Sequence, residues 1–116
     1  MAPGECSISV LSQPNLHQHH GFIHAGVTTT IADTAAGFAA LTHFDKDSEV
    51  VSAELKMSLL NPAVGDTLVA HARVVKAGRT LSTVRADVYA ISKGKDDVHV
   101  ATGLLTMFQV KPKSVV

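Results

Sequence analysis

The apolar and polar positions of this chain follow a helical period in one segment, from Ala25 to about Thr42. Apolar side chains recur there three or four positions apart, and alanine is frequent. That spacing and composition favour a helix over a strand. The positions that carry the pattern are Val27, Ile31, Ala35, Phe38, Ala39 and Leu41. We predict one mostly buried helix, which the polar stretch from His43 to Glu49 ends.

The pattern then changes to a period of two, which is typical of strands. Residues 51–59 alternate apolar and polar side chains and predict a half-buried strand. Two further alternating runs, 67–76 and 81–92, read as an antiparallel pair joined by a short turn. Residues 98–110 supply a last strand, and we expect Gly103 either to weaken its middle or to mark a bulge.

Before the helix, only Ser7 to Leu11 reads as a strand, and we expect it at a sheet edge. The predicted order is therefore one short strand, one helix and four strands in a meander without a long crossover. An antiparallel sheet of about five strands has one face free to wrap a single apolar helix, which is an α+β arrangement. The length of 116 residues suits one domain, and we expect it to span residues 1–116.

Composition narrows the functional classes. Ten basic residues balance ten acidic ones, so no basic stripe predicts nucleic acid as a partner. A single cysteine, Cys6, cannot form an internal disulfide, which makes the cytoplasm the default location. No window approaches the roughly 20 apolar residues of a membrane span, and Met1 to Val10 lacks the pattern of an export signal.

Histidine, glutamine and glycine gather just before the helix, and an aspartate, Asp33, lies inside it. The segment reads His17-Gln18-His19-His20-Gly21-Phe22-Ile23-His24-Ala25-Gly26. It resembles hotdog-fold thioesterases of the phenylacetate-degradation type and of the related enterobactin-proofreading type. Those families carry Asn or Gln, then Gly, then His-Gly-Gly, and then an acidic residue on the following helix at the spacing seen here between His24 and Asp33.

The resemblance implies a hotdog fold, in which the sheet wraps one long central helix, and the activity of an acyl-coenzyme A thioesterase. It extends more weakly through residues 51–54, 60–66 and 75–81. Two positions depart from the family pattern. Ala25 stands where the first glycine of His-Gly-Gly is usual, and Gly37 stands where some relatives place Ser or Thr.

Thioester hydrolysis needs a base or nucleophile, donors for the oxyanion and a dry pocket for the acyl group. Asp33 has apolar sequence neighbours, which suit a general base for water or a direct nucleophile, and the sequence leaves both roles open. The resemblance implies that the backbone amide of Ala25 binds the thioester oxygen. The first amides of a helix are unpaired and lie at its positive end, so this role agrees with helix physics.

Motif position assigns three further catalytic roles. Gln18 would orient the water or the carbonyl, His24 would shape the turn or donate to the ligand, and Ser52 would assist from the neighbouring strand. An alternative reading of Gln18 is a residue that satisfies backbone groups in its own loop, and of Ser52 an ordinary small strand residue.

For substrate binding, the resemblance points to Gly26 and to the turn formed by Gly78, Arg79 and Thr80. This turn looks like the family's nucleotide-contacting loop, where Arg79 could meet a phosphate of coenzyme A. An arginine in a turn is also commonly just solvated.

A distance argument predicts an oligomer. At about 1.5 Å per residue, Asp33 lies on the order of 10 Å along the helix from Ala25, too far for both to act on one carbonyl. In a twofold dimer with antiparallel helices, Asp33 of one subunit could face Gln18 and Ala25 of the other. The resemblance likewise implies a homodimer or a dimer of dimers.

Other readings remain open. The histidines at positions 17, 19, 20 and 24 could suggest a metal site, but no cysteine and no helical His-x-x-x-His accompanies them, so we expect neither metal nor cofactor. A hydratase or dehydratase of acyl thioesters, or a non-catalytic module that binds acyl-coenzyme A, would share the fold. The sequence does not name the acyl group.

Overall fold

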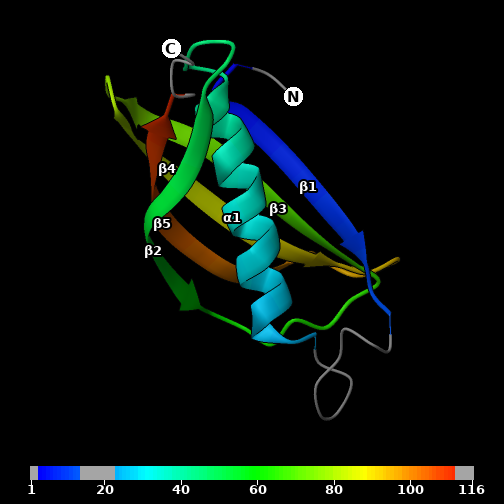
Figure 1. The fold of residues 1–116 in the computed structure, drawn as a ribbon. Helices are drawn as coiled ribbons and strands as arrows, with labels where there is room; N and C mark the ends of the chain where they lie inside the picture. The colour runs from blue at the N-terminus through cyan, green and yellow to red at the C-terminus, as the bar shows by residue number, and fades with distance from the viewer. Residues whose placement is uncertain (1–2, 14–22, 112–116) are drawn as a thin grey trace.

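The computed structural model describes residues 3–13 and 23–111, which form a curved antiparallel sheet wrapped around one helix (Figure 1). This is the α+β hotdog arrangement that the sequence predicts. Within the described residues, no helix has the length and apolar character needed to cross a membrane. The elements in chain order are β1 (Glu5–Leu11), α1 (Ala25–Leu41), β2 (Glu49–Leu59), β3 (Thr67–Ala77), β4 (Leu81–Ile91) and β5 (Val98–Val110).

The order of strands in the sheet is β1-β3-β4-β5-β2, with every neighbouring pair antiparallel. Strands β3, β4 and β5 form the predicted meander. The prediction that β2 starts this meander without a crossover is wrong, because β2 pairs with β5 at the far edge of the sheet. In the predicted meander β2 would pair with β3, but β1 occupies that edge of β3. The two outer strands, β1 and β2, both contact α1.

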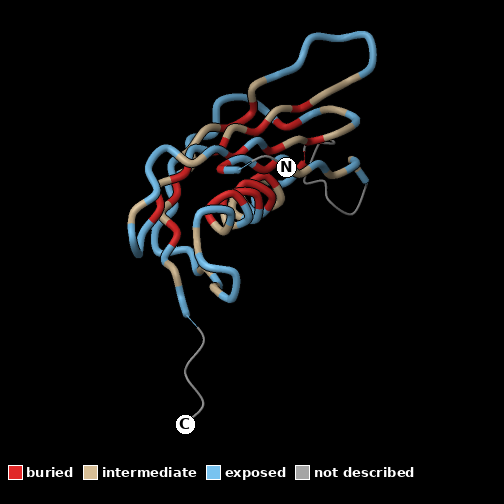
Figure 2. The backbone as a smooth tube through the Cα atoms, turned by 90° about the horizontal axis from the view of Figure 1, so that it is seen from above, coloured by how far each residue is buried: buried red, intermediate tan, exposed pale blue. Residues whose placement is uncertain are grey.

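Alanine forms the side of α1 that faces the sheet. In Figure 2 the buried side of the helix lies directly under the strands. The helix residues that are 0% exposed are Ala32, Ala35, Ala36, Ala39 and Ala40. Larger buried side chains from the sheet, among them Leu68, Val84 and Leu105, fill the space opposite. Alanine favours helix and loses no side-chain entropy, so ordering this face costs little entropy. Its small side chains also let the helix lie close to the sheet.

The opposite side of α1 departs from the prediction of a mostly buried helix. Phe38, which fits the apolar spacing, is 48% exposed, and Thr30 and Thr34 beside it are also exposed. Each threonine hydroxyl donates to the carbonyl four residues earlier, from Thr30 to Gly26 and from Thr34 to Thr30. One side of the helix is therefore open to solvent in the single chain.

Strand β2 is also more exposed than predicted. Only Val50 and Met57 are partly buried, and Val51, Leu55 and Leu59 are 52%, 43% and 59% exposed. The expectation of a half-buried strand is wrong for the chain alone, because β2 lies at the sheet edge and α1 covers only part of it. An edge strand of 11 residues with exposed apolar side chains is a common place for self-association.

Gly103 marks no bulge in β5. It pairs with Met57 of β2 and with Ala86 of β4, and the pairing runs without a break on both sides of it. The register shift between β4 and β5 lies further along, at Val88 and Tyr89. A Cβ atom at Gly103 would overlap the carbonyl oxygen of Lys56 and the sulfur of Met57. Glycine is needed here for the close approach of two backbones.

We predict that Gly103→Ala lowers the free energy of unfolding by roughly 1–3 kcal/mol, because the new methyl group must push β2 away from β5. The matched change Gly37→Ala should raise it by about 0.5–1 kcal/mol, since the added Cβ meets only Val50 at 3.5 Å and alanine favours helix. Urea unfolding followed by circular dichroism measures both. Equal stability of the two variants would contradict this account of Gly103.

Candidate active site

Asp33 and Ser52 meet where α1 passes β2. The hydroxyl of Ser52 donates a hydrogen bond of 2.5 Å to Oδ1 of Asp33 and also lies 3.6 Å from the sulfur of Met107. A register shift in β2 follows Ser52 directly. Such a bulge re-aims side chains, and Ser52 points toward the helix side of the sheet, opposite the buried Met107. The structure thus brings together two of the residues assigned from the sequence.

Asp33 lies at the border between the buried and open sides of α1. Its neighbour Ala32 is fully buried against the sheet, while Thr34 is exposed. The apolar sequence neighbours of Asp33 therefore do not enclose it in the single chain. Its carboxylate is partly buried, held at one oxygen by Ser52, and lies beside the open side of the helix.

His24 caps the start of α1. Its backbone is extended, with φ −60° and ψ 138°, and its Nδ1 accepts a hydrogen bond of 2.9 Å from the amide of Gly26. Its carbonyl accepts the first bond of the helix, from Val27. Of the two roles assigned to His24, the structure shows the one in shaping the turn. The donor role toward a ligand stays a prediction.

Ala25 is the first residue of the helix, and no acceptor for its amide lies among residues 3–13 and 23–111. It stands eight residues before Asp33, which corresponds to about 12 Å along the axis. Within one chain, the assigned oxyanion donor and the assigned carboxylate therefore lie far apart. Gln18 lies outside the described residues, as do His17, His19 and His20, so its role stays a prediction.

The turn between β3 and β4 is tight. The amide of Gly78 donates to the carbonyl of Leu81 at 2.8 Å, and a Cβ at Gly78 would lie 2.5 Å from the same oxygen. The carbonyl of Thr80 accepts from the amide of Gln109, while Arg79 is exposed and has no ion pair with a described residue. The geometry leaves the Arg79 guanidinium free to meet an anion.

This turn lies at the end of the molecule opposite to Ala25 (Figure 1). The amide of Val74 donates to the carbonyl of Gly4, and the amide of Gly4 donates to the hydroxyl of Thr42, the residue that caps the end of α1. The end of β3 is thereby fixed near the carboxyl end of the helix. The predicted site residues of one chain consequently fall into three separate places.

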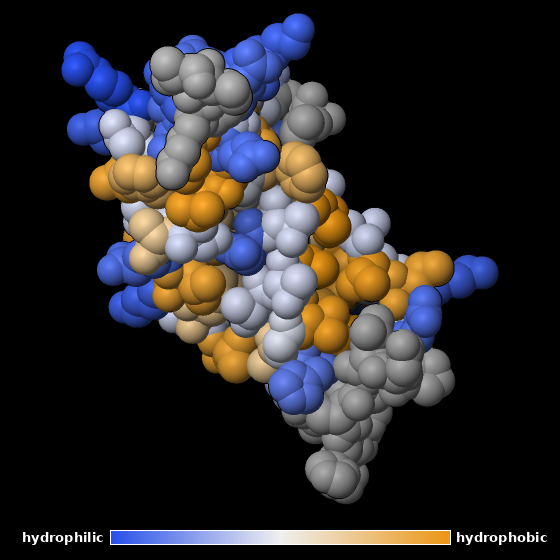
Figure 3. Space-filling view, viewed as in Figure 1, coloured by the Kyte–Doolittle hydropathy of each residue, from blue (hydrophilic) through white to orange (hydrophobic). Residues whose placement is uncertain are grey.

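An apolar cavity of about 340 Å³ lies next to the start of α1. Ala25 and Thr28 of the helix line it, together with Leu59, Pro62 and Val100 from the sheet and the loop after β2. Figure 3 shows apolar surface on both sides of the polar strip that the open side of α1 makes. The sequence analysis missed this cavity, because its walls come from three segments that are distant in the chain.

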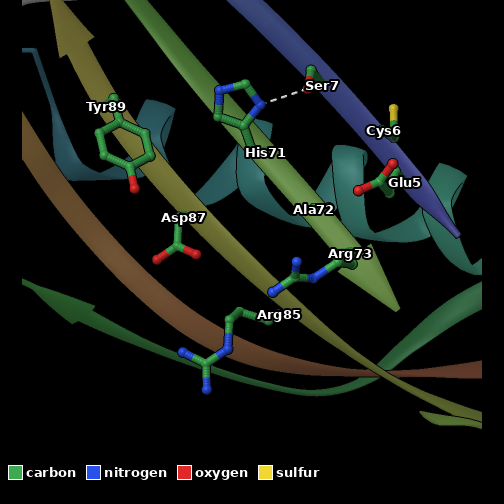
Figure 4. Close-up of a pocket in the computed structure, with 9 residues that line it drawn as sticks. All are labelled: Glu5, Cys6, Ser7, His71, Ala72, Arg73, Arg85, Asp87 and Tyr89. Atoms are coloured by element: carbon green, nitrogen blue, oxygen red, sulfur yellow. Dashed lines mark hydrogen bonds between the residues drawn. The ribbon is translucent and has the colours of Figure 1, made fainter. Parts of the chain in front are cut away.

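A second hollow, of about 510 Å³, lies on the face of the sheet that points away from α1 (Figure 4). Ser7 shares a hydrogen bond of 2.6 Å with Nδ1 of His71, and the ring of Tyr89 stacks on His99, whose Nε2 lies 2.9 Å from Asp87. The hollow also contains Glu5, Arg73 and Arg85. Sequence reasoning assigned no role to these strand residues, and the sheet separates them from Asp33.

Among the described residues, neither a group of metal ligands nor a concentration of charge of one sign suggests another functional site. No three His, Cys, Asp or Glu side chains are grouped so that they could hold a metal ion in the part of the chain that the structure describes. The two carboxylates of the outer hollow, Glu5 and Asp87, face two arginines in the same hollow, so its charges of both signs balance. The Asp33–Ser52 pair and the start of α1 therefore remain the strongest candidates for chemistry.

Comparison with known proteins points to one family. A sequence model of the thioesterase superfamily matches residues 20–95, a range that includes α1 and β2 to β4. The crystal structure of a thioesterase family protein from Silicibacter pomeroyi is similar with a TM-score of 0.93 and 35% identity, over 97% of this chain and 82% of that chain.

Two curated relatives agree with this match. A candidate esterase of Halobacterium salinarum is 30% identical over 115 residues, which cover 91% of this chain and 76% of that protein. Acyl-coenzyme A thioesterase 13 of Homo sapiens is 28% identical over 99 residues, which cover 81% of this chain and 67% of that protein.

We predict that His24→Ala lowers the free energy of unfolding by about 0.5–2 kcal/mol, because the Gly26 amide loses its acceptor. His24→Asn should restore most of this loss, since asparagine is a favourable N-cap residue. Thermal and urea unfolding of the three proteins measure the difference. If alanine and asparagine destabilise equally, the imidazole does not act as the cap.

Proposed function

This chain belongs to the thioesterase superfamily, and on that premise we propose that it hydrolyses acyl-coenzyme A to the free acid and coenzyme A. Its class is thioester hydrolase. The similarity to human acyl-coenzyme A thioesterase 13 supports coenzyme A as the carrier. The observation that carries the proposal is the Asp33 carboxylate, which Ser52 holds at one oxygen beside the open side of α1.

Asp33 supplies the reacting group in this proposal. Because the Ser52 hydroxyl occupies Oδ1, the carboxylate has a fixed orientation and its second oxygen is available to the substrate side. That oxygen either takes a proton from the attacking water or attacks the thioester carbon itself. Ser52 acts as a positioning residue in both cases, and its hydroxyl keeps the carboxylate from rotating.

The Ala25 amide supplies the oxyanion donor. It stands at the positive end of a helix of 17 residues, where developing negative charge on the thioester oxygen is stabilised. His24 fixes this end by its cap on Gly26, so the donor is oriented before the substrate binds. Gln18 completes the set by motif position, where it would orient the water or the carbonyl.

We propose that two chains share each site. Ala25 and Asp33 are separated by about 12 Å on one helix, so one carbonyl cannot reach both in the same chain. A twofold pair with antiparallel helices puts Asp33 of one subunit near Ala25 of the other, and forms two equivalent sites. The exposed edge strand β2 and the open side of α1 provide the contact surface. The pair can assemble further into a dimer of dimers.

The same arrangement gives the turn at Gly78 to Thr80 a place in substrate binding. It lies at the carboxyl end of α1, which antiparallel packing brings toward the amino end of the partner helix. The exposed Arg79 would then meet a phosphate of coenzyme A while the thioester lies at the partner's Ala25. A module that binds acyl-coenzyme A without hydrolysis would use the same contacts, and turnover separates the two.

We predict that Asp33→Asn reduces kcat by about 10²–10⁴-fold, because the amide neither accepts a proton nor attacks carbon. Asp47→Asn, a change in the exposed loop before β2, should leave kcat unchanged. Free-thiol release from butyryl-, octanoyl- and phenylacetyl-coenzyme A measures both. Near wild-type turnover in the Asp33 variant would exclude its proposed role, and binding without turnover by the wild type would favour the non-catalytic module.

A complementation experiment tests the shared site. Ala25→Pro removes the amide hydrogen at the first helical position, where proline is tolerated, and the extended backbone of His24 suits a residue before proline. Alone, this variant and Asp33→Asn should both be nearly inactive. Unfolded and refolded together in equal amounts, they should regain about a quarter of wild-type activity, since half of the dimers then carry one intact site. An inactive mixture that still contains heterodimers would place both groups in the same subunit.

A further inference from the structure

We infer that Met107 is a positioning residue for Asp33, because its buried side chain holds the Ser52 hydroxyl in the orientation that donates to the carboxylate. The inference rests on the proposed function, which makes Asp33 the reacting group, and it adds a residue that the sequence motif does not contain. Met107 lies on β5 directly opposite Ser52 and is 1% exposed. Its sulfur stands 3.6 Å from the hydroxyl oxygen of Ser52.

The orientation of the Asp33 carboxylate depends on one hydrogen bond. Among the described residues, Ser52 is the only group that donates to this carboxylate, and no cation forms an ion pair with it. Residues four apart on a helix are neighbours, but Gly37 has no side chain that could reach Asp33. A carboxylate with a single donor is held only as firmly as that donor.

Strand β2 does not fix the side chain of Ser52 by itself. Ser52 is exposed on an edge strand, and the next residue, Ala53, has no partner in β5. A serine side chain has three staggered orientations, and an exposed position leaves more than one of them open. The hydroxyl would then be free to turn toward water. A neighbouring side chain must therefore select the orientation that faces Asp33.

Met107 is this neighbour. It belongs to the hydrophobic core, and its register partners are Ser52 on β2 and Ser82 on β4. A thioether is a weak acceptor, whereas the carboxylate carries charge, so the single hydroxyl proton of Ser52 goes to Asp33. The methionine side chain fills the space on one side of the hydroxyl and offers no group that competes for its proton.

The hydroxyl of Ser82 indicates independently that this part of the core lacks a strong acceptor. Ser82 is 0% exposed, and its hydroxyl has no hydrogen-bond partner among the described residues. Buried hydroxyls are rarely left in this state, because the hydration they lose is not replaced. Ser82 and Ser52 flank the same methionine, and neither gains a strong hydrogen bond from it. Ser52 alone has a carboxylate within reach.

A double-mutant cycle tests the inference, with whichever of butyryl-, octanoyl- and phenylacetyl-coenzyme A the wild type hydrolyses fastest. Met107→Gln brings in an amide oxygen that competes for the Ser52 proton, so kcat should fall about tenfold while KM changes less than about twofold. Ser52→Ala should lower kcat by a similar factor, and Met107→Gln added to it should change kcat less than about twofold. Met107→Leu, which keeps an apolar side chain of similar volume, should retain most of the wild-type kcat.

Carbon-13 NMR of the Asp33 carboxyl group gives a second measurement that needs no turnover. Loss of the Ser52 hydrogen bond should move this resonance in the same direction in Ser52→Ala and Met107→Gln, and Met107→Leu should leave it in place. If circular dichroism shows that Met107→Gln does not fold, Met107→Ala, which leaves the hydroxyl free to turn, replaces it in both measurements.

Equal losses of kcat from the Met107 change with and without Ser52 would show that Met107 acts through general packing, and would overturn the inference. An Asp33 resonance that stays in place in Met107→Gln would overturn it too, as would a Met107→Leu variant as slow as Met107→Gln. If the wild type hydrolyses no thioester while the resonances move as expected, the proposed function fails and the positioning of Asp33 by Met107 stands.

Discussion

The close contact between an alanine face and a curved sheet determines the rest of this structure. The side of α1 toward the sheet carries side chains of a single methyl group, so the helix axis lies near the strands and the large residues of β3, β4 and β5 fill the remaining space. At this separation a short serine on β2 reaches the aspartate on the helix. A leucine at Ala32 or Ala36 would force α1 outward, and the Ser52–Asp33 bond would be lost with it.

The same geometry explains why one chain leaves apolar surface uncovered. Five strands about 4.8 Å apart are wider than one helix of about 10 Å, so α1 cannot cover the whole inner side of the sheet. The uncovered part lies toward β2, where Leu55 and Leu59 are exposed, and next to it Phe38 projects from the open side of the helix. A second helix beside the first would cover these side chains, and this is the geometry of the shared site proposed above.

The sequence pattern predicted the helix and the strands well, but it predicted poorly which strands lie side by side in the sheet. The last strand was predicted at its observed bounds and the helix to within one residue, because alanine content, the polar stretch after residue 42 and alternation are local signals. Alternation tells which residues of β2 share a face, but not that the strand crosses to β5, nor that its inner face stays uncovered. A glycine in a strand likewise does not distinguish a bulge from the close approach that Gly103 permits.

The same limit applies to the site. The motif placed Asp33, Ser52 and the start of the helix, and the structure joins the first two by a hydrogen bond. The apolar cavity could not be predicted, because Ile23, Leu59 and Val100 become neighbours only when β2 pairs with β5 and the loop after β2 binds the backbone of β5. The outer hollow was missed for a similar reason, since the pairing of His71 with Ser7 depends on the register of β1 and β3.

The alanine that replaces the first glycine of the motif changes the shape of the site more than its chemistry. Ala25 is an ordinary helical residue, and the glycines with positive φ among the described residues are Gly4 and Gly94, far from this turn. Its amide is retained, and its methyl group becomes part of the cavity wall. At the next position the geometry is stricter, because a Cβ on Gly26 would stand 3.1 Å from the Nδ1 atom of His24 that caps the helix. The cap is therefore more sensitive to a side chain at the second position, Gly26, than at the first, where Ala25 keeps the backbone amide and adds only a methyl group.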